Sequence, residues 1–292
     1  MSPRNIAKRW LKWSMEAGMA WSGVGSLYHR SRSFQTGHRI LTYHRIIEDP
    51  GDSHSIHPTH FKEHMAFLSD HFPVVSIEDI AAHVRKIKSL NQHSVAISFD
   101  DGYKEYESIA AETLDRYRLP ATFFVVTGVL DGLFGPSAGT YLDWQGVKAL
   151  HAQGFSIGSH CVTHVSLGTI APAQVQEELR LSRTRIAEEL GTAPSGVSYP
   201  YGTLRDFSID TPQMAERAGY TWGVTALHGL NHAGANQFLL RRTSITVGDG
   251  LKTFRMIMKG FLDPWFIVDR LGYRFQRPHI NVREEIAEKK CG

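Results

Sequence analysis

Cysteine is scarce in this chain of 292 residues, which has two, Cys161 and Cys291, far apart in the sequence. Such a pair gives no pattern of the kind that builds a disulfide framework, and this mildly favours a reducing compartment. A large excess of charge is also lacking, because the formal net charge is +3. So small an excess gives no reason to expect a nucleic-acid partner, and we expect none.

Long apolar runs are absent as well, so the sequence predicts no transmembrane helix. The N-terminus starts with basic residues as a secretory signal does, but Glu16 interrupts its apolar part and no convincing cleavage site follows. We therefore expect no signal peptide and a cytoplasmic location, and export by an unrecognised route stays open as the alternative. We divide the chain into a basic amphipathic segment at 1–35, a barrel domain at 36–275 and a charged tail at 276–292.

Residues 4–13 alternate basic with large apolar side chains. A helix packed on the domain's own surface would show this pattern. So would a segment lying in the membrane interface, where tryptophans anchor and cations face anionic headgroups. We favour the first interpretation, and peripheral contact with the inner membrane face stays open as the second.

Short apolar strands alternate with amphipathic helices from Ile40 onward. The predicted strands cover 39–44, 73–76, 95–99, 121–126, 155–159, 195–199, 220–225 and 239–246. The predicted helices cover 58–70, 77–84, 103–117, 144–153, 172–190, 211–218 and 251–260. Such alternation indicates an α/β fold with a parallel sheet, and the number of units is near that needed to close a (β/α) barrel.

Reactive side chains in such barrels gather where the strands end. The polar groups at predicted strand ends are Tyr43-His44, Asp100-Asp101, Ser159-His160, Tyr199–Gly202 and a loop with His228 and His232. The long irregular segment 127–140 also follows a strand. It is therefore a candidate substrate-gating loop.

Two patterns indicate a metal site. Asp100 and Asp101 follow a buried strand, and adjacent carboxylates at a strand end commonly stay charged because a cation is bound, although a polar turn before a helix would also use them. His160 and His164 are four residues apart, which on a helical turn would put both imidazoles on one face. Two imidazoles and one carboxylate leave positions open for water and substrate, as hydrolytic metal sites require.

Three motifs, in order, resemble those of the polysaccharide deacetylases with the NodB-homology domain (carbohydrate esterase family four). Ser98–Gly102 resembles the first motif, Thr-Phe-Asp-Asp-Gly, and His160–His164 the second, His-Ser/Thr-x-x-His. Ser198–Gly202 is similar to the third, Arg-x-Pro-Tyr-Gly, except at its first position. The resemblance runs from about residue 40 to 245, and it implies a distorted (β/α) barrel.

The resemblance also implies an activity, the removal of N-acetyl groups from an amino sugar in a polysaccharide, oligosaccharide or lipid-linked precursor. Asp101, His160 and His164 would hold a divalent metal, zinc first, with cobalt, nickel or manganese also admitted by such ligands. Asp100 would be the general base that deprotonates the attacking water. The backbone N–H of Tyr201 would help to bind the oxyanion.

The sequence departs from the family pattern at two places. Ser198 stands where the third motif has an arginine that orients the base, so another cation must align Asp100, and Arg45, Arg241 and Arg242 are the candidates. The histidine that serves relatives as general acid has no clear match. We choose His44 first, ahead of His228 and His232, while a purely hydrogen-bonding role for His44 stays equally open.

These departures keep two other functions open. The chain could hydrolyse another carbon–nitrogen amide bond on the same barrel, or it could be a glycan-binding protein with a degraded site. Cys161 replaces the usual hydroxyl of the second motif, and we expect it to be an inert small side chain rather than a further ligand.

Overall fold

The structure, a computed structural model, describes residues 14, 18, 28–50, 52–134 and 139–264. Seven strands form a parallel sheet in the order β6-β5-β4-β3-β2-β1-β7. The strands are β1 (Arg39–Tyr43), β2 (Val95–Phe99), β3 (Thr122–Val125), β4 (Ser156–Ser159), β5 (Gly196–Ser198), β6 (Trp222–Val224) and β7 (Thr243–Ser244). The predicted parallel α/β arrangement is confirmed.

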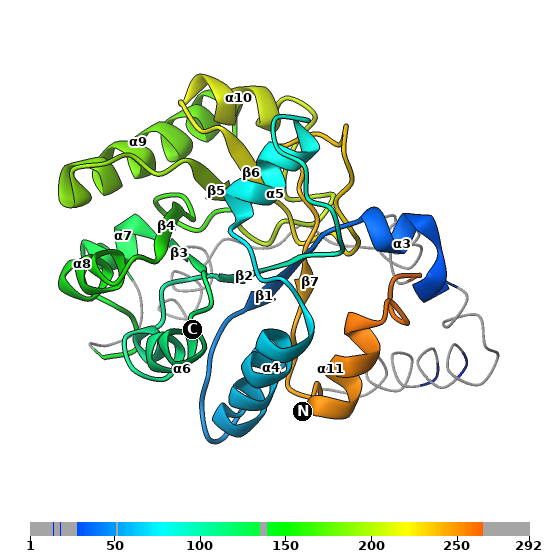
Figure 1. The fold of residues 1–292 in the computed structure, drawn as a ribbon. Coiled ribbons are helices and arrows are strands. Elements are labelled where there is room, and N and C mark those ends of the chain that lie inside the picture. The colour runs from blue at the N-terminus through cyan, green and yellow to red at the C-terminus, as the bar shows by residue number, and fades with distance from the viewer. Residues whose placement is uncertain (1–13, 15–17, 19–27, 51, 135–138, 265–292) are drawn as a thin grey trace.

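The sheet curls until its two edges meet. Leu240, just before β7, pairs in parallel with Val224 of β6, while Thr243 of β7 pairs with Leu41 of β1. The segment from Leu240 to β7 therefore lies between β6 and β1 and closes the sheet. Figure 1 shows the sheet at the centre of the molecule with helices around it, which is the distorted (β/α) barrel expected from the sequence.

Helices follow most of the strands, as βα units require. They are α3 (Arg32–Thr36), α4 (Pro58–His71), α5 (Ile77–Val84), α6 (Ile109–Tyr117), α7 (Thr127–Leu130), α8 (Trp144–Ala152), α9 (Pro172–Leu190), α10 (Thr211–Arg217) and α11 (Leu251–Met258), with a 3₁₀ helix η1 (Lys104–Tyr106). Local signals set several ends: Ser76 and Asp143 cap the starts of α5 and α8, and Gly191 ends α9 in the left-handed region at φ 71°.

Three predicted elements differ in the structure. The last strand, expected at 239–246, covers Thr243–Ser244 alone. The helix expected from residue 103 is interrupted, because η1 comes first and α6 begins at Ile109. The strand expected at 73–76 is reduced to a bridge between Val74 and Val95. In the described part of the chain, no helix combines the length and hydropathy needed to cross a bilayer. Residues 4–13 and 276–292 lie outside the described residues, so the expectations for them stay predictions.

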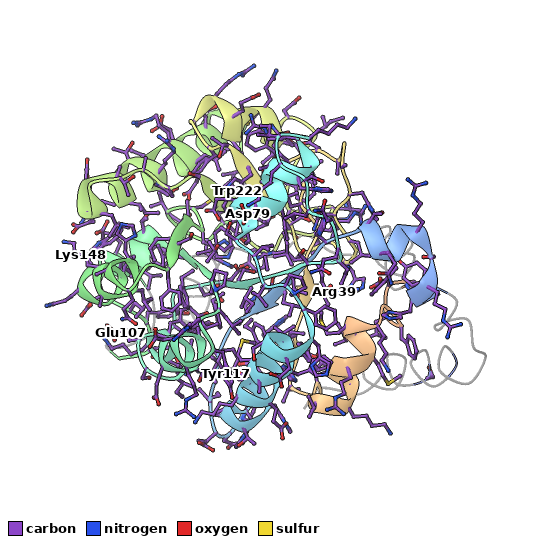
Figure 2. The ribbon with its side chains drawn as sticks, in the orientation of Figure 1. Arg39, Asp79, Glu107, Tyr117, Lys148 and Trp222 are labelled. Atoms are coloured by element: carbon purple, nitrogen blue, oxygen red, sulfur yellow. The ribbon has the colours of Figure 1, made fainter. Side chains whose placement is uncertain are left out.

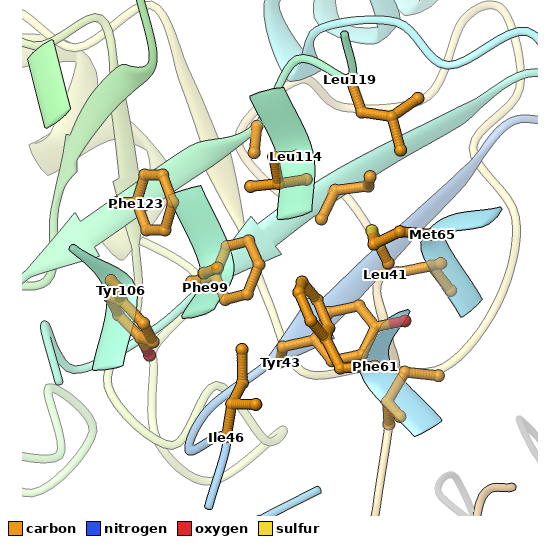
Figure 3. Close-up of a cluster of buried hydrophobic side chains, with 14 of the residues drawn as sticks. Leu41, Tyr43, Ile46, Phe61, Met65, Phe99, Tyr106, Leu114, Leu119 and Phe123 are labelled. Carbon is orange, nitrogen blue, oxygen red and sulfur yellow. The ribbon is translucent and has the colours of Figure 1, made fainter. Parts of the chain in front are cut away.

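Most of the apolar core lies between the sheet and its outer helices. Leu41, Tyr43, Phe99 and Phe123 point outward from β1, β2 and β3 and are buried against side chains such as Met65 of α4 (Figure 3). Burial of side chains of this size contributes about 1.5–3 kcal/mol each. This layer determines which side chains of the strands point outward, and therefore which side chains point into the barrel.

The inward-facing residues alternate with the outward ones. Ile40 of β1, Ala96 of β2 and Phe124 of β3 form a second apolar group inside the barrel, covered by α5. Two residues further along, the hydroxyls of Thr42 and Ser98 lie 3.1 Å apart. The barrel interior therefore changes from apolar to polar toward the carboxyl ends of the strands.

Three buried histidines outside this polar interior should make the fold sensitive to acid. Burial lowers the pKa of His38 and of His64 from 6.5 to about 3, and that of His93 to about 4. The unfolded chain thus binds more protons than the folded chain below pH 6.5, and the free energy of unfolding should fall as the pH falls through this window. At pH 5 the loss is about 2 kcal/mol for each histidine.

Urea unfolding at pH 7.5 and pH 5 would measure this loss. We expect a lower midpoint at pH 5, and a smaller pH dependence for His64→Phe, whose ring can keep the stacking of His64 on Phe254 at 3.8 Å. An unchanged midpoint for the unmodified protein would contradict the prediction.

Candidate metal centre

Three side chains from the ends of β2 and β4 converge at the polar end of the barrel. Asp101 Oδ1 lies 3.4 Å from His160 Nε2 and 3.3 Å from His164 Nε2, and the three donor atoms lie within 4.8 Å of one another. Two atoms that each bind a tetrahedral zinc ion at about 2.0–2.1 Å are about 3.3 Å apart. The spacing therefore fits a single small cation.

Hydrogen bonding around His160 supports the same fit. Its Nδ1 donates to the carbonyl oxygen of Ser198 at 2.7 Å, so the neutral ring presents the lone pair of Nε2 to the carboxylate of Asp101. Burial lowers the pKa of His160, but the charges of Asp100 and Asp101 outweigh it and raise that pKa above its ordinary value. Positive charge is thus favoured between these groups, as a bound divalent cation would supply it.

The segment that carries the two histidines is a bent loop and not the helical turn that the sequence predicted. Cys161 and His164 have φ of 63° and 53°, in the left-handed region that side chains usually avoid. Glu178 of α9 stabilises the loop by accepting hydrogen bonds from the backbone N–H of Val162 at 2.8 Å and of Thr163 at 3.0 Å. It also accepts one from the Thr163 hydroxyl at 2.7 Å.

Replacing Glu178 with glutamine is expected to weaken binding of added zinc by about 10–100-fold, because the loop that places the ligands loses its anchor. The neutral amide oxygen accepts the two backbone N–H groups more weakly than the carboxylate does, which should also lower the free energy of unfolding by about 1–3 kcal/mol. Isothermal titration with zinc and urea unfolding would measure both. Glu177→Gln is the matched control, since Glu177 is exposed on the same helix and pairs with Arg180; equal affinities in the two variants would contradict the prediction.

Cys161 does not join the cluster of donor atoms. Its side chain is fully buried among apolar residues that include Val197 and Tyr199, and burial raises the pKa of the thiol well above its ordinary value. The neutral thiol is a packing group here, as expected from the sequence.

Backbone strain is concentrated around the same cluster. Of the six described non-glycine residues with positive φ, four surround it: Asp101 (79°), Cys161 (63°), His164 (53°) and Tyr201 (59°). Such conformations each cost about 1–3 kcal/mol and persist where surrounding contacts hold them, often at functional sites. No sequence motif signalled this strain at Tyr201, whose ring lies 4.7 Å from that of His164.

Asp100 lies beside the three donor atoms and is almost fully buried. The Arg242 guanidinium donates to both of its oxygens, Nη1 to Oδ1 and Nη2 to Oδ2, each at 2.7 Å, and the Ser198 hydroxyl donates to Oδ2 at 3.2 Å. Burial raises the pKa of Asp100, but the charges of Arg242 and His160 outweigh it and keep that pKa below its ordinary value. Asp100 is therefore held as a carboxylate.

Of the three histidines considered as proton donors, one faces this end of the barrel. His44 follows β1, close enough to Asp100 and Asp101 for both carboxylates to raise its pKa, although burial has the larger effect and lowers it. Its Nδ1 is buried with no hydrogen-bond partner in the described structure. The site therefore includes one imidazole outside the three-atom cluster.

The loop of His228 and His232 runs to the opposite end, so its expected place at the strand ends was wrong. Asn231 of this loop forms an antiparallel bridge with His38, which precedes β1. His228 lies 3.4 Å from Asp263, the ion-pair partner of Arg39 at the start of β1 (Figure 2).

Two tyrosines that the sequence reasoning did not single out border the cluster. The rings of Tyr103 and Tyr141 stack 4.9 Å apart, and Arg45 lies 5.1 Å above the ring of Tyr103. After burial, the charge of Asp101 is the largest influence that raises the pKa of both phenols, which places them near the centre. Aromatic walls beside a few polar groups are typical of ligand sites.

Comparison with known proteins adds a family to this geometry. The family model of polysaccharide deacetylases matches residues 87–223, which include the segments of Asp100, His160 and Tyr201. Residues 87–223, a little under half of the chain, therefore match the polysaccharide deacetylase domain. Among its relatives is YxkH of Bacillus subtilis, itself assigned to the polysaccharide deacetylases, with 28% identity over 212 residues that cover 72% of this chain and 71% of YxkH.

Three further comparisons give lower sequence identities. The poly-β-1,6-N-acetyl-D-glucosamine N-deacetylase of Staphylococcus aureus is 22% identical over 238 residues, 77% of this chain and 79% of that one. Of solved structures, the Streptococcus pyogenes deacetylase PplD has a TM-score of 0.68 at 22% identity, covering 77% of this chain and 99% of that one. IcaB from Ammonifex degensii has a TM-score of 0.67 at 20% identity, covering 77% and 97%. These likenesses show the shared fold.

Proposed function

We propose that this protein is a metal-dependent hydrolase that removes N-acetyl groups from an amino sugar in a polysaccharide, oligosaccharide or lipid-linked precursor. The observation that carries the proposal is the convergence of Asp101, His160 and His164 beside a separate buried carboxylate, Asp100. A relative named for N-deacetylation of poly-N-acetylglucosamine supports the substrate class.

Asp101, His160 and His164 would hold a divalent cation, with zinc as first choice and cobalt, nickel or manganese as alternatives. Bound there, the cation would polarise the acetamide carbonyl and make the attacking water more acidic. The three ligands together leave coordination positions open, as a hydrolytic site requires.

Asp100 would accept the proton of the attacking water. In the described structure its Oδ2 accepts two hydrogen bonds, from Arg242 and Ser198, while Oδ1 accepts one, from Arg242. Since each carboxylate oxygen has two lone pairs, Oδ1 is the atom that keeps room for a proton. The hydrogen bonds from Arg242 fix the direction in which that lone pair points.

Two further groups would complete the reaction. The backbone N–H of Tyr201 would donate to the oxyanion that forms when water attacks the carbonyl. Its positive φ sets the direction of this part of the backbone after Pro200. His44 would donate a proton to the leaving amine, because it lies near Asp100 and Asp101 and does not belong to the ligand set.

Metal analysis of the purified protein, combined with an acetate assay on N-acetylglucosamine oligomers, tests the proposal. We expect one divalent ion per chain and acetate release that stops when a chelator removes the ion and returns when zinc is added. A metal-loaded protein that releases no acetate from these oligomers, from N-acetylated polymer or from a lipid-linked N-acetylated sugar would overturn it. Release of ammonia, or opening of a cyclic amide, would assign the barrel to another carbon–nitrogen hydrolase.

A further inference from the structure

Position 198 poses a problem for the proposed base. The third family motif begins with an arginine that orients the base carboxylate, and this chain has Ser198 there. Ser198 is fully buried at the end of β5, and its hydroxyl reaches Asp100 Oδ2 at 3.2 Å. A serine hydroxyl can donate one neutral hydrogen bond, so it cannot replace the charge or the two-point contact of a guanidinium.

Arg242 supplies both the charge and the two-point contact, from a different segment of the chain. It lies between Leu240, which pairs with β6, and β7, so it enters the site from the segment that closes the barrel. Its two terminal nitrogens contact the two oxygens of Asp100 at 2.7 Å each, in the parallel arrangement that suits guanidinium and carboxylate. Nη2 also donates to the hydroxyl of Ser198 at 2.9 Å.

Backbone carbonyl groups on the side away from Asp100 hold Arg242 in place. Nε donates to the carbonyl oxygen of Thr225 at 2.8 Å, and the backbone N–H of Arg242 donates to the carbonyl oxygen of Leu227 at 3.0 Å. The side chain is 2% exposed. Because each nitrogen of the guanidinium has a hydrogen-bond partner, the orientation of the group is fixed before any substrate binds.

The other two candidate arginines are engaged elsewhere. Arg45 pairs with Glu105 at 2.7 Å, and Arg241 donates from Nη1 to the carbonyl oxygen of His228 at 2.9 Å. A serine at position 198 also has a physical reason, because a long cationic side chain there would bring a second guanidinium against one buried carboxylate.

We propose that Arg242, which directly precedes the last strand β7, is the positioning residue for Asp100. It performs the task that the third motif assigns to position 198. The inference rests on the proposed function, since it gives Arg242 a purpose only if Asp100 acts as the base. The direction of the carboxylate, and not metal binding, is what Arg242 controls.

A reciprocal exchange of the two positions tests this proposal. Arg242→Ser is expected to lower kcat for acetate release by about 10²-fold, the cost of misplacing a reacting group by about 1 Å, while KM and metal content stay near the unmodified values. The double variant S198R/R242S should recover at least about tenfold of the lost kcat, because the guanidinium returns from the neighbouring side. The single variant Ser198→Arg should have a lower kcat than the unmodified protein.

Arg242→Lys covers the case in which Arg242→Ser fails to fold, since it keeps a cation against Asp100. One ammonium cannot fix both oxygens, so kcat should still fall by at least about tenfold in a variant that stays folded and keeps its metal. Full kcat in Arg242→Lys, or a folded double variant no more active than Arg242→Ser, would overturn the proposal. An unmodified protein that releases no acetate would instead refute the proposed function, which keeps the two failures distinct.

Discussion

Replacing His164 with alanine is expected to lower acetate release by about 10³-fold, and to remove most of the zinc that the purified protein retains. The variant loses one of the three donor atoms that converge near Asp101 Oδ1, and with the ion goes several kcal/mol of transition-state stabilisation. Metal content by mass spectrometry and kcat on N-acetylglucosamine oligomers should be measured on the same preparation, so that the two losses can be compared directly.

His60→Ala is the matched control for this prediction. His60 is a partly exposed histidine of the outer helix α4, where it pairs with Glu63 at 3.1 Å, so its removal should leave zinc content and kcat unchanged. If His164→Ala kept both, the centre at Asp101 would be wrong. If it lost the metal and kept the activity, the metal would have no part in the reaction.

Replacing Asp100 with asparagine should lower kcat by about 10²–10⁴-fold and leave the metal in place. Asparagine keeps the shape of the side chain and one carbonyl oxygen for Arg242, but it cannot take a proton. The three donor atoms of Asp101, His160 and His164 are unchanged in this variant. Metal content and kcat, measured together, separate the loss of a base from the loss of an ion.

The adjacent residue supplies the comparison. Asp101→Asn should lose zinc and activity together, whereas Asp100→Asn should lose activity alone. Two neighbouring carboxylates with the same substitution thus give different results only if their roles differ as proposed. Loss of metal in Asp100→Asn, or full kcat in that variant with metal bound, would contradict the assignment.

The sequence predicted the closeness of His160 and His164 correctly and the local structure incorrectly. A spacing of four residues is compatible with a helical turn, and also with a bend through left-handed residues, as the structure has it at Cys161. The bend depends on Glu178 of α9, which accepts hydrogen bonds from two backbone N–H groups of the bent loop. Glu178 is 15 or 16 residues away along the chain from the two groups that it binds, so no local pattern could indicate it.

The choice between Arg241 and Arg242 shows a second limit. Both were candidates to align Asp100, and they are neighbours in the sequence. Side chains near a strand alternate between its two faces, so a shift of one residue in the pairing with β6 or β1 would exchange them. The pairing of Leu240 with Val224 sets this alternation, and it directs Arg242 toward Asp100 and Arg241 toward the carbonyl of His228.

The sequence by itself determined the alternation of strands and helices and the candidate site groups, which are the three possible metal ligands Asp101, His160 and His164 and the separate carboxylate of Asp100. These follow from apolar periodicity and from side-chain chemistry, which act over a few residues. The tertiary structure decided which arginine holds Asp100, where the loop of His228 and His232 runs, and how the loop after His160 bends. Each of these depends on contacts between segments far apart in the chain, and such contacts exist only once the sheet has closed.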